Sequence, residues 1–537
     1  GTPCVRVAPE ERAAPRTRVV RKQALRGATT LAKFFSSLNK AATPHPKEER
    51  HRVFYDNETD KPREECGIFG VYSRHDNVAL TTYWGIYALQ HRGQESAGIT
   101  VTDGTVMDIP RGMGLVNEVF RQGLPELPNS HIAIGHVRYS TTGSSLLVNT
   151  QPLLVSYSGG QISLAHNGNL TNAKEIRAEL EKQGSVFQTS IDSEVLVNLI
   201  ARSKKTSVEE KITESLAQIQ GAYCLVIMTE NQLIGVRDPH GFRPLCIGKL
   251  NGGWVLASES CALDTVGAEL VRDVEPGEMV IIDDNGLRSV RFAEGDRRSL
   301  CVFEYIYFAR PDSIIDGQSV YQARFDMGRK LARESGFKAD IVISVPDSGT
   351  TAALGFSYES GIPFAEGLMK NRYIGRTFIQ PEQKKRDLGV RIKLNAVRSV
   401  VQGKSVIMVD DSIVRGTTSG KIVRMLKEAG ATAVHMCVSS PPIAYPCYYG
   451  IDTAVRKELI AATKKVEEIR QFIGADSLYY LSQEGLHGTL ANIKFDRMCY
   501  ACFNSDYPCH TPCDEETASA KFIFEPGSGR RGNGGAQ

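Results

Sequence analysis

The part of the chain that most constrains its fold is the segment 406–421, which reads VIMVDDSIVRGTTSGK. It opens with an apolar, β-rich run, residues 406–409, that is long enough for a buried strand. Two adjacent carboxylates, Asp410 and Asp411, end the run, and a loop of glycines, hydroxyls and one cation precedes a helical pattern. Backbone N–H groups at such a junction point at an anion, while paired carboxylates suit Mg²⁺ or sugar hydroxyls. The segment predicts a phosphate-ester site after a buried strand, and the alternative is an ordinary turn with solvated acids.

A second feature is a cysteine that begins an apolar, strand-like run at residues 66–72. The preceding residues 61–65 are charged and contain proline, so we expect them to be exposed and open to cleavage. A cut before Cys66 would place a thiol and a free α-amine on one residue. An α-amine has a pKa near 8 and can act as general base to its own nucleophile. The alternative is a small core cysteine.

The start of this run, residues 66–70, is the first of five motifs, and the other four follow in order at residues 89–98, 135–141, 165–169 and 192–194. They are similar to those of class II glutamine amidotransferases, and the 406–421 segment resembles the 5-phosphoribosyl-1-pyrophosphate (PRPP) loop of type I phosphoribosyltransferases. Joined in this order over about residues 60–510, they resemble the amidophosphoribosyltransferase family, in its branch with an iron–sulfur cluster and a propeptide. The resemblance implies glutamine-dependent amination of PRPP to 5-phosphoribosylamine, glutamate and pyrophosphate, the first committed step of de novo purine (IMP) biosynthesis.

The resemblance assigns roles in glutamine cleavage. It implies that the Cys66 thiolate attacks the glutamine amide and that Asn167 and the Gly168 N–H form the oxyanion hole. Glutamine itself would be held by three residues: Arg138 by bidentate contact with the α-carboxylate, Asp192 at the α-ammonium, and Thr141. Ammonia would then pass through an internal channel to the second domain.

The acceptor half has two predicted loops. A β-rich run at residues 341–345 precedes the pyrophosphate loop that the resemblance implies, and both loops together supply the expected PRPP ligands: Asp347, Ser348, Gly349, Thr350, Asp410, Asp411, Ser412, Arg415, Gly416, Thr417, Thr418 and Ser419. The implied Mg²⁺ ligands are Ser348, Asp410 and Asp411. Residues 370–393 hold eight Lys and Arg against two acids, and their position matches the family's flexible catalytic loop; a solvated surface loop is the alternative.

Twelve cysteines raise the question of metal binding. Read locally, the C-terminal group suits Zn²⁺; its members are Cys499, Cys502, Cys509 and Cys513, with His510 as a substitute. The resemblance instead implies a structural [4Fe–4S] cluster on Cys301, Cys447, Cys499 and Cys502. We expect the remaining single cysteines to be inert; they are Cys4, Cys224, Cys246, Cys261 and Cys437.

The expected fold is α/β with two domains. Residues 66–300 would form a glutaminase domain, a four-layer αββα sandwich of the N-terminal-nucleophile type with helices near 173–183 and 192–203. Residues 301–513 would form the phosphoribosyltransferase domain, in which helices near 321–335 and 420–429 alternate with strands of a parallel sheet, plus a C-terminal cluster-binding segment. Residues 1–65 are read as leader and propeptide, and residues 514–537 as a disordered tail.

Composition and charge limit the classes of partner and the location that we expect for this chain. A net charge of +3 in 537 residues gives no global support for nucleic-acid binding, and no apolar run reaches the roughly 20 residues that span a bilayer, so we expect a soluble protein. Residues 1–47 carry ten Lys and Arg against two acids, which favours a plastid transit peptide over a disordered cytoplasmic extension. The resemblance adds glutamine and PRPP as substrates, purine nucleotides as feedback inhibitors and a homo-oligomer, tetramer or dimer.

Three other functions are consistent with parts of the pattern. A sugar-phosphate amidotransferase would lack the 406–421 loop, and a base-salvage phosphoribosyltransferase would not need Cys66, Arg138, Asn167 and Asp192. A non-catalytic nucleotide or redox sensor would keep both folds for binding alone. The last is disfavoured because Cys66 and both aspartates are intact.

Overall fold

A computed structural model describes residues 66–139, 143–371, 393–453, 455–490, 497–509, 511 and 524. All of these belong to one compact unit, residues 56–537. The predictions for the leader, Thr141, most of the 370–393 loop, His510, Cys513 and the tail fall outside the described residues. Within the described part of the chain, no helix is long and apolar enough to cross a membrane.

The first sheet has eight antiparallel strands in the order β12-β10-β11-β1-β5-β2-β3, with β4 paired to β2. Its central strand β1 begins directly after Cys66 and is buried along its whole length. The strands are β1 (Gly67–Tyr72), β2 (Ser96–Thr102), β3 (Met107–Asp108), β4 (Arg111–Met113), β5 (Ile132–Arg138), β10 (Cys246–Leu250), β11 (Gly253–Ala257) and β12 (Glu269–Asp273).

The second sheet has six antiparallel strands in the order β14-β13-β9-β8-β7-β6. Its longest strand, β7, carries the 165–169 motif in its second half. The strands are β6 (Leu153–Tyr157), β7 (Gly160–Leu170), β8 (Gly221–Met228), β9 (Leu233–Arg237), β13 (Glu278–Asp283) and β14 (Gly286–Arg291).

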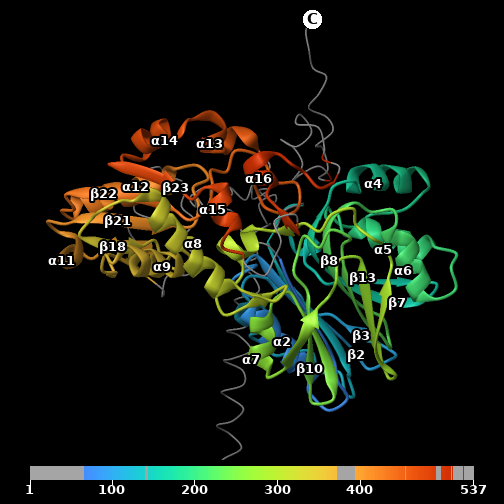
Figure 1. Cartoon of the computed structure of the whole chain (residues 1–537). Coiled ribbons are helices and arrows are strands. Elements are labelled where there is room, and N and C mark those ends of the chain that lie inside the picture. The colour runs from blue at the N-terminus through green and yellow to red at the C-terminus, as the bar shows by residue number, and fades with distance from the viewer. Residues whose placement is uncertain are drawn as a thin grey trace, which may run out of the picture. The chain divides into compact units, whose positions relative to one another are not determined.

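Helices cover the outer face of each sheet (Figure 1). The first sheet is covered by α2 (Val78–Ala88) and α7 (Ser260–Val266), with the short α3 (Val116–Val119) beside β2; the second is covered by α4 (Ala173–Lys182), α5 (Glu194–Arg202) and α6 (Val208–Leu216). Side chains such as Ile68, Ala165 and Val226 fill the space between the sheets. The αββα sandwich predicted from the sequence is confirmed.

The second half of the chain forms a four-stranded parallel sheet in the order β18-β21-β22-β23. Its strands are β18 (Ile341–Ser344), β21 (Ser405–Asp410), β22 (Ala433–Val438) and β23 (Ser477–Tyr480). One face packs on α8 (Val320–Ser335) and α9 (Thr350–Ser360), and the other on α12 (Thr417–Glu428) and α14 (Val466–Ile473). Parallel strands with helices on both faces are the expected α/β arrangement.

One predicted helix start was wrong. We expected a helix from residue 420, where its apolar pattern begins, but α12 starts at Thr417. Gly416 is its N-cap with a φ of +76°, a conformation that glycine adopts readily. The chain therefore enters the helix three residues earlier, and Thr417, Thr418 and Ser419 form its first turn.

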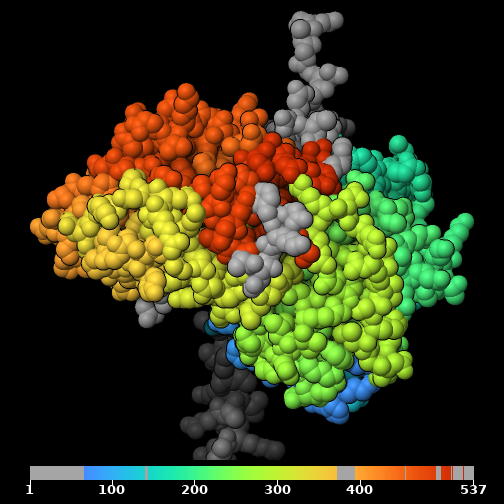
Figure 2. Space-filling view, in the orientation of Figure 1, coloured from blue at the N-terminus to red at the C-terminus, as the bar shows by residue number. Residues whose placement is uncertain are grey.

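The remaining elements connect the two halves or lie at their edges. They are η1 (Leu147–Asn149), β15 (Leu300–Cys301), the π-helix η2 (Glu304–Phe308), β16 (Ile314–Ile315), β17 (Gln318–Ser319), β19 (Leu368–Lys370), β20 (Leu394–Ala396), α11 (Arg398–Val401), η3 (Arg456–Glu458), α13 (Ile460–Thr463), α15 (Gln483–His487), β24 (Met498–Cys499) and α16 (Ala501–Asn504). β15 pairs in parallel with β24, so the C-terminal segment, red in Figure 2, returns to the start of the second half.

Candidate active sites

Cys66 is buried at the start of β1, and its thiol donates to the main-chain oxygen of Tyr139 at 3.3 Å. Burial raises the pKa of this thiol to about 11, while the Tyr139 contact and the charge of Arg138 lower it in part. The negative charges of Glu95 and Asp192 act in the opposite direction. A thiol with this raised pKa is protonated at neutral pH and needs a base. In this chain the Cys66 nitrogen is part of the peptide bond to Glu65 and cannot be that base.

The two predicted oxyanion residues lie in β7. Asn167 is buried, and its side-chain Nδ2 has no hydrogen-bond partner among the described residues. A buried amide donor without a partner costs free energy, and that cost is recovered when a ligand oxygen accepts from it. Gly168 has a φ of +144°, and a Cβ there would collide with the main-chain oxygen of Ala222. The backbone at this position therefore requires glycine.

Two of the predicted glutamine ligands, Arg138 and Asp192, lie within the described residues, one at the end of β5 and the other just before α5. Arg138, at the end of β5, is buried and donates to the main-chain oxygens of Ser144 at 3.2 Å and Gly143 at 3.5 Å. Asp192 is buried and accepts from the Leu170 N–H at 2.9 Å. Burial acts to raise the pKa of Asp192, but the His166 ring and this hydrogen bond hold it below its ordinary value. Arg138 and Asp192 therefore bring a cation and a carboxylate to the site, which match the two charged ends of an amino acid.

A buried charge network behind Cys66 was not predicted from the sequence. Arg92 donates from Nε to the Cys66 main-chain oxygen at 3.2 Å, from Nη1 to Glu259 at 2.6 Å and from Nη2 to Glu304 at 2.7 Å. All three side chains are fully buried. Burial acts to raise the pKa of Glu259, but His91 and Arg92 hold it well below its ordinary value. The 89–98 motif contains both basic residues, yet nothing local to it indicates their partners.

The acceptor site begins at the end of β21, where Asp410 and Asp411 are both buried. Asp411 accepts from the hydroxyls of Ser348 and of Ser412, the latter at 2.6 Å, and its own N–H donates to Asp410 Oδ1 at 2.9 Å. The three predicted Mg²⁺ ligands thus share one corner of the parallel sheet. Arg324, on α8, is buried nearby; burial lowers its pKa to about 10, and the Asp411 charge acts to raise it.

The predicted pyrophosphate loop lies directly beside this corner. Gly349 approaches β21 so closely that a Cβ there would lie 2.6 Å from the Val409 main-chain oxygen. The Asp347 carboxylate accepts from Lys370 Nζ at 2.6 Å, and the Thr350 hydroxyl contacts Ser344 at 3.2 Å. The two loops, 60 residues apart in sequence, therefore meet at the carboxyl ends of β18 and β21, where open α/β sheets bind ligands.

The N-terminus of α12 completes the predicted PRPP loop. Thr417, Thr418 and Ser419 form its first turn, where helix N–H groups and the helix dipole favour an anion. The side chain of Arg415 forms an ion pair with Glu458, with Nε at 3.1 Å from Oε2. This cation is therefore held beside the helix start rather than extended into solvent.

Four cysteines predicted as cluster ligands come from three segments of the second half. Cys301 and Cys499 are directly paired in β15 and β24. Burial raises the pKa of Cys502, and the charges of Cys301, Cys499 and Cys447 raise it further, so the four thiols are neighbours. Among the described residues, no three His, Cys, Asp or Glu side chains already stand in a metal-coordinating arrangement. Four adjacent thiols nevertheless form a donor set that suits an iron–sulfur cluster.

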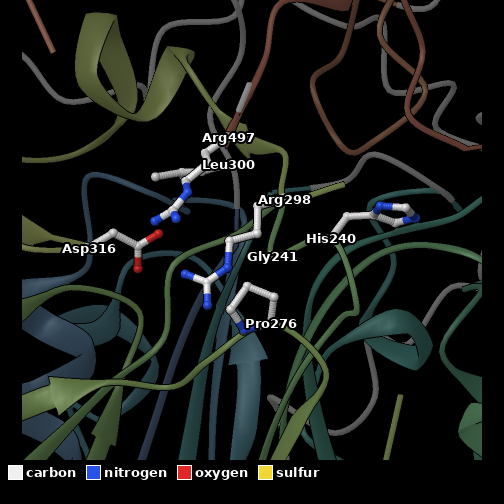
Figure 3. A pocket seen from close by; sticks show the side chains of 7 residues that line it. All are labelled: His240, Gly241, Pro276, Arg298, Leu300, Asp316 and Arg497. Atoms are coloured by element: carbon white, nitrogen blue, oxygen red, sulfur yellow. The ribbon is translucent and has the colours of Figure 1, made fainter. Parts of the chain in front are cut away.

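A small pocket lies next to β15 (Figure 3). Its volume is about 60 Å³, and it is lined by His240, Gly241, Pro276, Arg298, Leu300, Asp316 and Arg497. Arg298 is paired with Glu275, and Asp316 accepts two hydrogen bonds from the buried Arg237. None of the predicted substrate ligands lines it.

Comparison with known proteins gives a consistent result. Residues 136–265 match the family model "Glutamine amidotransferase domain". The amidophosphoribosyltransferase of Bacillus subtilis is 54% identical over 83% of this chain and 94% of its own length. Amidophosphoribosyltransferase 1, chloroplastic, of Arabidopsis thaliana is 51% identical over 87% of this chain and 83% of its own length.

Solved structures agree with the sequence relatives. The structure of the B. subtilis glutamine PRPP amidotransferase complexed with ADP and GMP covers 84% of this chain with a TM-score of 0.79 and 53% identity. These relatives match both halves of the chain, which excludes the sugar-phosphate and base-salvage alternatives. The chain belongs to the amidophosphoribosyltransferase family, the glutamine-dependent transferases that open purine biosynthesis.

Proposed function

We propose that this chain converts PRPP, glutamine and water into 5-phosphoribosylamine, glutamate and pyrophosphate, with residues 66–300 as glutaminase domain and residues 301–513 as transferase domain. The observation that carries the proposal is the presence of two separate sites on one chain. One pairs a buried thiol with an unpartnered amide donor, and the other joins two carboxylates to a phosphate-type loop.

The proposed first half-reaction is amide cleavage at Cys66. The thiol gives its proton to the α-amine freed by removal of residues 1–65, and Sγ attacks the glutamine amide carbon. Charge develops on the amide oxygen, where the Asn167 Nδ2 and Gly168 N–H donate to it. The C–N bond breaks, the leaving ammonia takes the proton, and water hydrolyses the thioester to glutamate and the free thiol. Arg138 and Asp192 hold the two charged ends of glutamine, with Thr141 as a further ligand.

The proposed second half-reaction is displacement of pyrophosphate from ribose C1 by ammonia. The α12 N-terminus and its hydroxyls hold the 5-phosphate, and residues 347–350 hold the pyrophosphate. Mg²⁺, when bound by Ser348, Asp410 and Asp411, neutralises charge on the leaving group. Asp410 and Asp411 also accept from the ribose hydroxyls. Such a step needs positioning and exclusion of water more than a protein nucleophile.

Removal of residues 1–65 tests the glutaminase assignment. We expect a chain that starts at Cys66 to release pyrophosphate from PRPP and Mg²⁺ with either glutamine or ammonium, whereas the full chain uses ammonium only. We also expect alkylation of Cys66 at pH 7.5, followed by peptide mass spectrometry, to be about 100-fold faster in the shortened chain. The reason is that a thiol of pKa about 11 is almost wholly protonated there, and the free α-amine supplies the missing base.

Two outcomes contradict this assignment. Equal alkylation of Cys66 in both chains would remove the α-amine from the mechanism. Absence of pyrophosphate release with either nitrogen source would contradict the assignment of residues 301–513 as the transferase domain. It would favour the non-catalytic sensor alternative. Cys246, which is also buried with a raised thiol pKa, serves as the internal reference for alkylation.

Substitution of Asn167 by leucine tests the oxyanion hole. The change removes the donor and keeps the volume, so we expect kcat with glutamine to fall about 10²- to 10³-fold, because one such donor contributes about 3–4 kcal/mol. KM for glutamine and the ammonium-dependent rate should change little. Asn198→Leu is the matched control, since the Asn198 amide donates to the Glu194 main-chain oxygen within its own helix. A parallel loss of ammonium-dependent activity would contradict the assignment.

We propose that Cys301, Cys447, Cys499 and Cys502 hold a [4Fe–4S] cluster that joins the C-terminal segment to the rest of the transferase domain. The support is the β15–β24 pairing and the proximity of the four thiols. Cys502→Ser should lose most of the iron, measured by metal analysis, and the visible absorption, while Cys509→Ser keeps both. If the protein instead holds zinc, and Cys509→Ser loses that zinc, the result would favour the Zn²⁺ site on the C-terminal cysteines.

Three further proposals concern regulation, assembly and location. The B. subtilis relative was solved with ADP and GMP, and we propose that purine nucleotides inhibit this chain by occupying the PRPP site. We propose a homo-oligomer, a tetramer or dimer, which light scattering would measure.

We also propose plastid import directed by the basic leader, supported by chloroplastic relatives. Retention in the cytoplasm of a fluorescent protein that carries residues 1–65 would contradict this proposal.

A further inference from the structure

Three residues of the second half lie directly against the proposed oxyanion turn of the first. We call Tyr448, Tyr449 and Gly450 the strap. The Asn169 side chain donates from Nδ2 to the Tyr448 main-chain oxygen at 2.9 Å. Gly450 has a φ of +116°, and a Cβ there would lie 3.4 Å from the main-chain carbon of Gly168. A side chain added at Gly450 would thus contact the backbone that carries the oxyanion donor.

A buried arginine holds the middle of the strap. Arg243 is fully buried and donates from Nη2 to the Tyr449 main-chain oxygen at 2.5 Å. The neighbouring Phe242 ring stacks on Tyr449 with 4.3 Å between ring centroids. A Cβ on Gly450 would lie 2.9 Å from the same Arg243 nitrogen. Arg243 and Gly450 therefore fit each other closely, and neither has room to move.

The same arginine is linked to the nucleophile. Its Nη1 lies 3.7 Å from Glu304, and Glu304 accepts from Arg92, which donates to the Cys66 main-chain oxygen at 3.2 Å. Buried charges are retained only when they are well paired. Two buried ion pairs, Arg243 with Glu304 and Glu304 with Arg92, thus lie between Arg243 and the Cys66 main chain.

We propose that the strap positions the Gly168 N–H in the oxyanion hole, with Asn169, Arg243 and Gly450 as positioning residues that do not touch glutamine. The proposal rests on the role proposed for Gly168. A hydrogen-bond donor stabilises developing charge only when it is held at the correct distance and angle. Residues from the transferase half therefore complete the glutaminase site, and the two halves are coupled in chemistry as well as in packing.

Two variants test the strap, each with a matched control. Asn169→Asp keeps the shape of the side chain and replaces the donor to Tyr448 by an acceptor; Asn198→Asp is its control. Gly450→Ala places a methyl group against Arg243 and Gly168. Its control is Gly252→Ala, because Gly252 also has a positive φ, of +84°, but has nothing within 4 Å of an added Cβ.

The readouts separate positioning from a merely structural role. We expect both strap variants to lower kcat with glutamine about 10- to 100-fold, with KM for glutamine within about threefold and the ammonium-dependent rate unchanged. A glutamine analogue with an aldehyde in place of the amide adds the Cys66 S–H across its C=O bond and places an oxygen in the oxyanion hole. Its inhibition constant should rise by the factor by which kcat/KM falls. The control variants should behave like the chain that carries no substitution.

Three results would overturn the proposal. Unchanged kcat in both strap variants would show that Gly168 needs no support from the strap. A parallel fall in ammonium-dependent activity would make the strap a general packing element. Unaltered affinity for the aldehyde would show that the strap does not position the oxyanion hole. Failure of the otherwise unsubstituted chain that starts at Cys66 to hydrolyse glutamine at all would instead contradict the proposed function.

Discussion

Cys66→Ala is expected to abolish glutamine-dependent turnover, by on the order of 10⁴-fold or more, and to leave ammonium-dependent pyrophosphate release intact. The thiol is the proposed nucleophile, and alanine provides no group that can form the thioester. The acceptor site lies on other elements, β18, β21 and α12, and does not need the thiol. The measurement is pyrophosphate release by the chain that starts at residue 66, at saturating glutamine and, separately, saturating ammonium.

The matched control is Cys246→Ala. Cys246 is buried, and its thiol donates to the Ala257 main-chain oxygen at 3.3 Å, the same contact and distance that Cys66 makes with Tyr139. This variant should keep both activities. If Cys66→Ala keeps more than about one per cent of the glutamine-dependent rate, Cys66 is not the nucleophile.

Asp411→Asn is expected to lower pyrophosphate release on the order of 10³-fold with both nitrogen sources. The asparagine has the same shape, but it lacks the charge that would hold Mg²⁺ against the leaving pyrophosphate. Loss of several kcal/mol of charge stabilisation, at about 1.4 kcal/mol per tenfold, gives this magnitude. Glutamate release from glutamine should persist, because the glutaminase residues are unchanged.

Asp340→Asn is the control for this substitution. Asp340 bonds the Ser405 N–H and hydroxyl at the opposite end of β21, away from the carboxyl end where Asp411 lies. It should leave both activities unaltered. A loss confined to the glutamine-dependent rate in Asp411→Asn would contradict the Mg²⁺ role and indicate an effect on ammonia transfer instead.

The sequence was most informative where chemistry is carried by neighbouring residues. The Asp410–Asp411 pair and the hydroxyl run at 417–419 sit at a strand end and a helix start, and those junctions are visible in local periodicity. The helix boundary was three residues late, because the first turn of α12 consists of hydroxyl residues whose pattern does not differ from that of a loop. Gly416, whose positive φ begins the helix, was the available signal.

The sequence was least informative about buried charge. No local pattern marks Arg92, Arg243 and Glu304 as buried, and charged side chains are rarely buried. Their contacts span 26 to 212 positions along the chain, and no local pattern reports on such separations. Only a fold that removes all of them from water makes their pairing necessary.

By itself, therefore, the sequence determined the two chemistries, because a nucleophile, an amide donor and a carboxylate pair belong to compact motifs set by strands and turns. The tertiary structure alone decided which residues of the two halves contact each other. Contacts such as those of Asn169 with Tyr448 and Arg243 with Tyr449 use main-chain oxygens that every residue has, so composition cannot predict them. They form because packing of the second half on the first leaves these donors no water to bond.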